Sequence, residues 1–430
     1  MDLPEKFIFI IIHIGFVSLV PYHHHQNVDM YWPCNLSTTL SNSSTINDNV
    51  ENDEPCPLIH SSINFNRSLY LTLTQSQLLI WNIRPKVVIS KIIRSSDDLN
   101  RYGNNVYAHW KPDSNCIIVS TDDDYLLVYD VHSSSTSTYR YANTNQTKST
   151  FLLDAGQSID LPLTWLKLKH ALKVRNRLQS YFVTNNFIYI TTTINPSIKM
   201  ISFNNTISNL EFNLKSFDWI INSDKPVTHL NYSFKHQSFI WITADGHAYS
   251  TSYSPSEQTW YGHCIYLPEL IENQSFATTS SFNNSFSLIS IGNTIGDVYN
   301  YNLRPRDESP LLSHSFRSSD SSLESVNSLS WTDDGYALAI GWENTWGLLS
   351  VYGRKLVPPS NDLMNFVPNS DSHKSNFKDR HIWGVSQIFW GIECLELYLL
   401  AHPGSFYGDD QLFCIPFAKS AVATHHSPVS

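Results

Sequence analysis

The sequence predicts an all-β protein, namely a seven-bladed WD-repeat-like β-propeller, and a phrase that occurs twice is the first observation behind this prediction. Residues 110–114 read WKPDS and residues 331–335 read WTDDG, and each copy lies between two short apolar-alternating or apolar-rich runs. Pro and Asp favour the early dihedrals of a tight turn, and Gly or Ser tolerates the later ones. Each phrase therefore predicts a β-hairpin, and hairpins that recur along a chain are typical of WD-repeat blades.

The composition is the second observation. Aromatic residues make up 13% of the 430 residues and charged residues only 15%, against about 25% charged residues in an average domain. The net charge is -10, whereas binding to nucleic-acid phosphates requires clustered Lys and Arg. We therefore expect a polar rather than ionic surface and no nucleic-acid partner.

Seven candidate blades follow one another at a spacing close to the roughly 40–45 residues of WD repeats. Each contains alternating strands around a turn, for example at residues 65–68 in the first blade and 234–237 in the fourth. The blades are predicted at residues 63–83, 106–131, 181–203, 227–253, 279–303, 326–352 and 386–417. A single ring is therefore expected over residues 57–417.

The domain boundaries surround this ring. Residues 1–29 are an N-terminal extension, either disordered or preceding the true start, and residues 30–417 form the propeller. Residues 30–56 are placed to supply a closing outer strand, because a free sheet edge exposes unpaired backbone groups. The Ser- and Thr-rich residues 132–150 indicate a loose insertion. Residues 418–430 are a tail that we expect to be truncated before further domains.

Five residues are expected to build the blade turns. Trp110 and Trp331 should be largely buried where a strand enters its turn. Asp113, Asp334 and Gly335 should shape the turns themselves, since Asp hydrogen-bonds locally and Gly accepts unusual dihedrals.

Two segments are candidates for contacts with partners. Trp342 and Trp346 flank a predicted hairpin on a rim, where exposed aromatic residues can anchor a partner. Residues 161–177 carry Lys and Arg among leucines, a pattern that can touch an anionic membrane. The alternatives are core packing for the two tryptophans and a solvated strand or helix face for the basic segment.

The sequence contains no easily identified enzyme motif. It has no Gly-x4-Gly-Lys-Ser/Thr phosphate loop, no Gly-x-Ser-x-Gly elbow and no His-Glu-x-x-His. The run of histidines at residues 23–25 is interpreted as part of a disordered tail. The three aspartates at residues 122–124 are interpreted as turn residues. We therefore predict no catalytic residue, no cofactor and no metal, and a protein that is not an enzyme.

The cysteines and the N-terminus bear on the compartment. Six cysteines, at positions 34, 56, 116, 264, 394 and 414, show no pairing or metal-ligand spacing, which suits free thiols in the cytosol. Residues 7–20 form an apolar run that is short for a membrane span and lacks the cleavage pattern of a signal peptide. Translation from Met30 is the interpretation ranked first. A signal peptide stays the alternative, and the Asn-x-Ser/Thr triplets at Asn35, Asn66, Asn145 and Asn231 would then be glycosylated.

Several stretches together resemble the N-terminal propeller of the RIC-one (ribosome control protein one) family. They are residues 30–32, 78–85, 109–131, 329–356 and 417–421. The resemblance covers the chain from Met30 to its C-terminus and is most specific in the first, second and sixth blades. It implies further β structure and a helical region beyond residue 430, so we expect this chain to be a fragment or an incomplete gene model.

The resemblance also implies a function. RIC-one proteins pair with an Rgp-one subunit on Golgi membranes, and the complex is a guanine-nucleotide exchange factor for the Rab GTPase of retrograde endosome-to-Golgi transport. The resemblance thus implies a cytoplasmic, non-catalytic scaffold subunit, peripheral on the Golgi membrane, with an Rgp-one-like subunit and a Rab as partners. It further implies that this chain alone does not exchange nucleotide. A generic WD-repeat adaptor of another trafficking complex and a secreted glycoprotein propeller are the alternative functions.

Overall fold

The computed structural model describes residues 57–83, 87–133, 148–152, 158–162, 164–193, 197–203, 210–221, 224–254, 259–271, 275–304, 308–317, 324–360, 382–391, 394, 396–403 and 411–416. Strands dominate these residues, and their helical elements are α3 (Ser96–Tyr102) and the short 3-10 helices η2 (Leu214–Ser216) and η3 (Pro268–Leu270). The chain divides into an N-terminal unit, residues 52–268, and a C-terminal unit, residues 269–430 together with 1–51. Each unit is described by itself.

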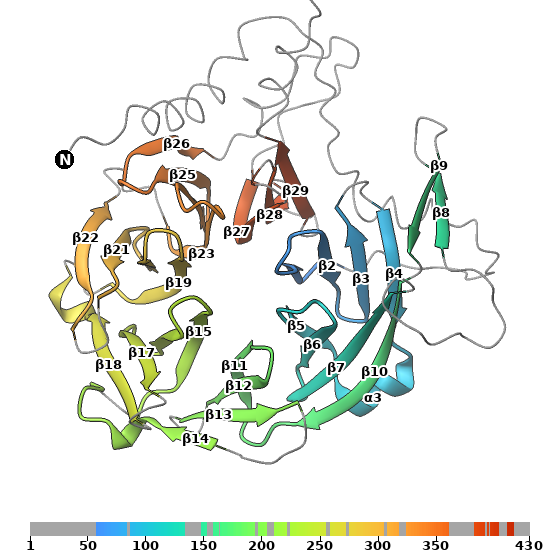
Figure 1. Ribbon diagram of the computed structural model, residues 1–430, viewed down its shortest axis with the longest axis horizontal. Coiled ribbons are helices and arrows are strands. Elements are labelled where there is room, and N and C mark those ends of the chain that lie inside the picture. The colour runs from blue at the N-terminus through green and yellow to red at the C-terminus, as the bar shows by residue number, and fades with distance from the viewer. Residues whose placement is uncertain are drawn as a thin grey trace, which may run out of the picture. The chain divides into compact units, whose positions relative to one another are not determined.

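The N-terminal unit contains four four-stranded antiparallel sheets, blue to yellow-green in Figure 1. The first sheet is β1 (His60–Ile63), β2 (Leu69–Leu73), β3 (Gln77–Asn82) and β4 (Val87–Ile93), and the second is β5 (Asn105–Trp110), β6 (Cys116–Thr121), β7 (Tyr125–Ser133) and β10 (Thr164–Lys173). The third is β11 (Leu178–Val183), β12 (Phe187–Thr192), β13 (Ser197–Ser202) and β14 (Leu210–Asn213). The fourth is β15 (Val227–Ser233), β16 (Ser238–Thr243), β17 (Ala248–Ser254) and β18 (Thr259–Tyr266). In each sheet the neighbouring strands follow in chain order, and only the second sheet has an excursion, between β7 and β10.

This excursion differs from the loose insertion predicted over residues 132–150. Residues 132 and 133 belong to β7, and residues 148–150 belong to β8 (Lys148–Leu152), which pairs with β9 (Ser158–Pro162) as a separate two-stranded sheet. The chain then returns as β10 and pairs with β7 over the full length of both strands. The basic segment of residues 161–177 therefore supplies the last strand of the second sheet, and Lys167, Lys169 and Lys173 are exposed on it.

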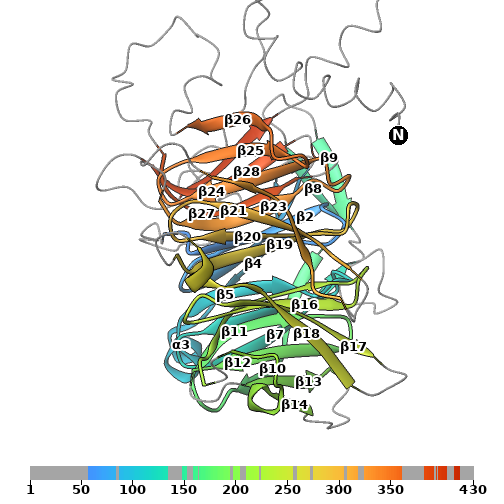
Figure 2. The same ribbon diagram turned by 90° about the vertical axis from the view of Figure 1, so that its left-hand side faces the viewer.

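The C-terminal unit contains two four-stranded sheets and one three-stranded sheet within its described residues. The fifth sheet is β19 (Ala277–Asn283), β20 (Leu288–Asn293), β21 (Val298–Asn302) and β22 (Leu311–Phe316). The sixth is β23 (Val326–Trp331), β24 (Ala337–Trp342), β25 (Trp346–Ser350) and β26 (Lys355–Ser360), and the seventh is β27 (Ile382–Trp390), β28 (Glu396–Pro403) and β29 (Gln411–Pro416). Figure 2 shows these sheets from the side, in yellow to red.

The repeated phrase of the sequence forms the same turn twice. After β5, the Lys111 N–H donates to the Cys116 carbonyl at 2.9 Å, and Ser114 adopts a φ of 61°. After β23, the Thr332 N–H donates to the Ala337 carbonyl at 2.9 Å, and Gly335 adopts a φ of 77°. A Cβ atom on Gly335 would overlap Asn283 Oδ1, so both the left-handed dihedral and the close approach require glycine at this turn.

Successive sheets within each unit pack face to face through apolar side chains. Leu71 and Ile80 of the first sheet pack with Ala108 and Ile117 of the second, and all four are fully buried. In the C-terminal unit, a Cβ on Gly341 of β24 would lie 2.7 Å from Cγ1 of Val385 on β27, so the absent side chain lets the next sheet approach. Four-stranded antiparallel sheets stacked in this way are the blades of a β-propeller.

Several sequence-based expectations fall outside the described residues. They are the extension at residues 1–29, the closing strand at residues 30–56, the histidines at residues 23–25 and the tail at residues 418–430. Among the described residues, no helix is long and apolar enough to cross a membrane. Cys116, Cys264 and Cys394 are free thiols, and Cys116 is buried.

Candidate interaction surface

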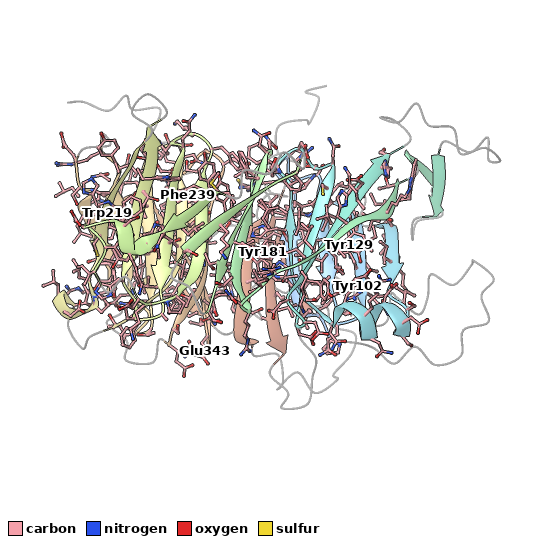
Figure 3. All side chains as sticks on the ribbon, turned by 90° about the horizontal axis from the view of Figure 1, so that it is seen from below. Tyr102, Tyr129, Tyr181, Trp219, Phe239 and Glu343 are labelled. Atoms are coloured by element: carbon pink, nitrogen blue, oxygen red, sulfur yellow. The ribbon has the colours of Figure 1, made fainter. Side chains whose placement is uncertain are left out.

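The two tryptophans proposed as rim anchors lie in the core. Trp342 is 1% exposed and Trp346 is 0% exposed. The Trp342 indole donates its N–H at 2.9 Å to the carbonyl of Gly296, which lies on the turn between β20 and β21. Glu343 between them is exposed and points away from the ribbon in Figure 3. The rim interpretation is therefore wrong for both residues, and the core-packing alternative holds.

The two tryptophans of the repeated phrase join neighbouring sheets. Trp110 and Trp331 are each 5% exposed. The Trp110 indole N–H donates to the Ser62 carbonyl at 3.2 Å, and the Trp331 indole N–H donates to Ser290 Oγ at 2.9 Å. Trp390, at the end of the first strand of the seventh sheet, donates in the same way to the Ser330 carbonyl at 3.0 Å. Trp390 belongs to the same structural set, although it lacks the Asp-containing turn that made the other two recognisable.

The aspartates of the repeated turns act locally. Asp113 accepts a hydrogen bond from the Asn115 N–H at 3.0 Å, and Asp334 accepts one from the Tyr336 N–H at 3.0 Å. The aspartates at residues 122–124 also bond to neighbouring loops, since Asp122 accepts from the Asn104 N–H at 2.7 Å. In the part of the chain that the structure describes, no three His, Cys, Asp or Glu side chains form a group that could hold a metal.

The first strands of the four N-terminal sheets carry a continuous cluster of aromatic and histidine rings. The His60 ring of β1 lies 3.8 Å from the Tyr107 ring of β5, measured between centroids. Tyr107 and His109 both meet Tyr181 of β11 edge to face, at 5.8 and 5.5 Å. The Tyr181 hydroxyl donates to the Ile118 carbonyl at 2.8 Å, and Figure 3 shows Tyr181 among the strands of this unit. Rings from three sheets therefore hold one another in place.

These titratable groups keep one charge state across the neutral pH range. Burial, with a smaller effect of His109, lowers the pKa of His60 from 6.5 to about 3. Burial and the neighbouring His229 lower the pKa of His109 to about 4. Burial raises the pKa of the Tyr107 phenol to about 12, although 38% of that side chain stays exposed. His60, His109 and Tyr107 are therefore uncharged at pH 7, which suits a packing and binding surface.

The cluster reaches the surface at the turns that follow β1 and β15. The Phe65–Phe234 patch, defined here as Phe65, Phe182, Tyr232 and Phe234, continues from His109, whose ring lies 5.4 Å from that of Phe182. Phe65 is 69% exposed and Phe234 is 36% exposed. Their rings meet edge to face at 6.1 Å, although they come from the first and fourth sheets. Two exposed aromatic rings are thereby presented together.

The sequence located both turns of this patch without identifying their function. Turn positions favour Gly, Pro, Asn, Asp and Ser, so a phenylalanine at residue 65 or 234 has no role in turn formation. A phenylalanine at a turn position was therefore the only feature of the sequence that indicated a possible binding role. What the sequence could not show is that the two turns, far apart along the chain, bring their rings together.

The C-terminal unit has its own exposed aromatic group with a different electrostatic setting. Phe286 is 36% exposed, and its ring meets that of Tyr336 edge to face at 4.9 Å. Tyr352, on the turn between β25 and β26, is 54% exposed. The turn that carries Tyr336 also carries the exposed, acidic Asp333 and Asp334. This surface therefore combines aromatic rings with negative charge.

Comparison with known proteins finds relatives that are named guanine nucleotide exchange factor subunits. No protein-family model matches the chain. The chain is 26% identical over 361 residues to a Schizosaccharomyces pombe protein named guanine nucleotide exchange factor subunit ric1, a match covering 77% of this chain and 32% of that protein. It is 21% identical over 372 residues to the Mus musculus guanine nucleotide exchange factor subunit RIC1, covering 81% of this chain and 25% of that protein. The chain thus spans a third or less of the length of these curated relatives.

A solved structure agrees with the fold. The crystal structure of the Myceliophteria thermophila Cps50 (Swd1) beta-propeller domain is similar to this chain with a TM-score of 0.55 and 10% sequence identity, covering 85% of this chain and 98% of that one. At this identity the likeness shows the fold alone, and it confirms the predicted WD-repeat-like β-propeller class. The count of seven blades stays a prediction. The two curated relatives confirm the resemblance to the RIC-one family.

Proposed function

We propose that this chain is a non-catalytic propeller subunit of a Rab guanine-nucleotide exchange factor complex in retrograde endosome-to-Golgi transport. The supporting observation is the match to two relatives that are both named guanine nucleotide exchange factor subunits, over 77% and 81% of this chain. The proposed partners are an Rgp-one-like subunit and the Rab GTPase of this transport step. The proposed location is the cytoplasm, peripheral on the Golgi membrane.

The surface chemistry of the chain is compatible with this role. Nucleotide exchange involves no covalent step, because a factor promotes release by binding the nucleotide-free GTPase better than the loaded one. Such an activity depends on broad, preorganised surfaces. The N-terminal unit offers exposed aromatic rings supported by an uncharged cluster, and the C-terminal unit offers aromatic rings beside Asp333 and Asp334. Both are binding features.

Complex formation with the partner subunit tests the proposal. The 430-residue chain and a purified Rgp-one-like subunit are mixed at micromolar concentration and analysed by size-exclusion chromatography with light scattering. We expect one species whose mass is the sum of the two proteins, and no such species with an unrelated WD-repeat propeller of similar size. Separate elution of the two proteins at every concentration would contradict the proposal.

A further inference from the structure

We propose that the Phe65–Phe234 patch is the surface on which the partner subunit docks, through an acidic segment that carries an apolar anchor side chain. This inference rests on the proposed function, because it requires a partner subunit. It goes further by naming the surface of this chain and the chemistry of the segment that binds to it.

The patch has the exposure and rigidity of an interface anchor. Burying a phenylalanine side chain is worth about 1.5–3 kcal/mol, yet Phe65 is left 69% exposed at the tip of a turn. The turn itself is built by other residues, since Arg67 adopts the φ of 54° and Asn66 Oδ1 accepts from the Ser68 hydroxyl at 2.6 Å. The Phe65 ring is thus not required by its own hairpin.

Neighbouring rings hold the patch in place before any partner arrives. Phe234 meets Tyr232 edge to face at 5.1 Å and lies 6.4 Å from Phe182. Tyr232 in turn packs against Phe239 of β16 at 4.5 Å, and Phe239 is buried. Preorganised aromatic anchors lose little conformational freedom on binding, which is why such residues dominate the binding energy of interfaces.

The charge around the patch selects the partner segment. The four turns that follow β1, β5, β11 and β15 carry Arg67, Lys111 and Lys235 as their basic residues and only Asp113 as an acidic one. Lys111 pairs with Asp113 at 2.6 Å. Three basic residues against one acidic residue give these turns a net positive charge. The chain as a whole has a net charge of -10. A positively charged turn surface on an acidic protein complements Asp and Glu on the partner.

These turns lie together in the N-terminal unit. Asn64 Nδ2 of the first donates to Ser114 Oγ of the second at 3.1 Å. The Phe65–Phe234 contact joins the first to the fourth. One partner segment can therefore contact both phenylalanines of the patch. It can also contact Arg67 and Lys235 on the same two turns.

The affinity of the purified Rgp-one-like subunit for variants of the full chain tests the inference. We expect Phe65→Ala together with Phe234→Ala to weaken binding about thirtyfold or more, the effect of losing an interface anchor. Arg67→Glu together with Lys235→Glu should weaken it similarly, and the wild-type affinity should fall as salt is raised from about 50 to about 500 mM. Leu270→Ala, which removes an apolar side chain that is 78% exposed on η3 and lies outside the patch, is the matched control and should leave the affinity within about twofold.

The outcomes separate this inference from the proposed function. No binding by the wild-type chain overturns both. Wild-type binding that survives the double phenylalanine change, or falls equally with Leu270→Ala, overturns the docking surface and leaves the proposed function standing. If the double variant unfolds at lower denaturant than wild type, Phe65→Ala alone decides, because its exposed ring contributes little to the core. Binding of 15-residue peptides that together cover the partner subunit's sequence tests the chemistry of the docking segment. Strongest binding by a basic peptide would contradict the proposal that this segment is acidic.

Discussion

Trp331 shows how one side chain can connect two sheets. Its indole is 5% exposed, and its N–H donates to Ser290 Oγ on β20 of the preceding sheet at 2.9 Å. Trp110 makes the corresponding contact to the Ser62 carbonyl. These residues couple the turn at the end of one strand to the face of the neighbouring sheet, so their contribution is to packing between blades.

Replacement of Trp331 by Ala should destabilise the fold by about 3–5 kcal/mol, because a large buried side chain leaves a cavity and a lost hydrogen bond. Trp110→Ala should have a cost in the same range. Chemical unfolding followed by circular dichroism measures both changes. A loss of under about 1 kcal/mol in the free energy of unfolding would show that the tryptophans of the repeated phrase do not stabilise the packing between sheets.

His60 gives the N-terminal unit a pH dependence. It is 2% exposed, and its Nε2–H donates to the Ala108 carbonyl at 2.8 Å. Burial lowers its pKa from 6.5 to about 3. Between these two values the unfolded chain binds a proton that the folded chain does not. Above pH 6.5 His60 is neutral in both states and does not lower the free energy of unfolding. As the pH falls from 6.5 toward 3, protonation of His60 in the unfolded chain alone lowers that free energy.

Through His60, the free energy of unfolding should be about 2 kcal/mol lower at about pH 5 than at about pH 7.5. His60→Gln can still donate to the Ala108 carbonyl but does not titrate, so the variant should lose about 2 kcal/mol less than wild type over this interval. Urea unfolding at the two pH values gives both differences. Equal acid losses in wild type and variant would show that His60 accepts a proton in the folded state.

At the scale of elements, a chain of hydrogen bonds crosses the fifth sheet from its last strand to the next sheet. His314 on β22 contacts Asn300 on β21 at 3.1 Å, and Ser290 on β20 donates to Asn300 Oδ1 at 2.5 Å. Ser290 also accepts from the Trp331 indole on β23. Asn300 and Ser290 are 1% and 0% exposed, so water cannot replace these bonds. Four strands thus share one buried polar network.

Ser290→Ala should cost about 2–4 kcal/mol, since it leaves the Trp331 N–H and the Asn300 oxygen without their buried partner. Trp331→Phe removes one of those groups, so Ser290→Ala should cost about 1 kcal/mol less in that background. Ser313 is exposed, and its Oγ lies 3.2 Å from His314 Nδ1 at the outer end of the network. Ser313→Ala is therefore the control and should change stability by under about 0.5 kcal/mol. Strict additivity of the Ser290 and Trp331 changes would show that the two side chains do not interact.

At the scale of the whole molecule, the blades could be predicted because each has an alternating strand pair around a turn with a recognisable cause. The burial of Trp342 could not be predicted from the sequence. β24 and β25 are buried on both faces, so their sequences have no polar–apolar alternation that distinguishes an inward-facing side chain from an outward-facing one. The pairing of β10 with β7 could not be predicted from the sequence either. It depends on pairing across a long excursion, and its exposed Lys-rich sequence lacks the apolar pattern of a buried strand.

The candidate surface shows the same limit. The turns of Phe65 and Phe234 were each locatable from local sequence, but their meeting at 6.1 Å is a property of the assembled sheets. Local chemistry predicts hairpins, whereas the convergence of side chains from the first and fourth sheets requires the three-dimensional arrangement. The candidate surface was therefore found only in the structure, while the proposed role in an exchange-factor complex depends on the relatives.

The central claim is that this chain is a binding subunit of an exchange complex and does not itself promote nucleotide release. Its most direct test is the release of a fluorescent guanine nucleotide from the Rab GTPase of Golgi retrograde transport, with this chain alone, the Rgp-one-like subunit alone, and both together. We expect this chain alone to leave release at the intrinsic rate, because a scaffold that does not favour the nucleotide-free state cannot shift that equilibrium. Rapid release by this chain without its partner would contradict the claim.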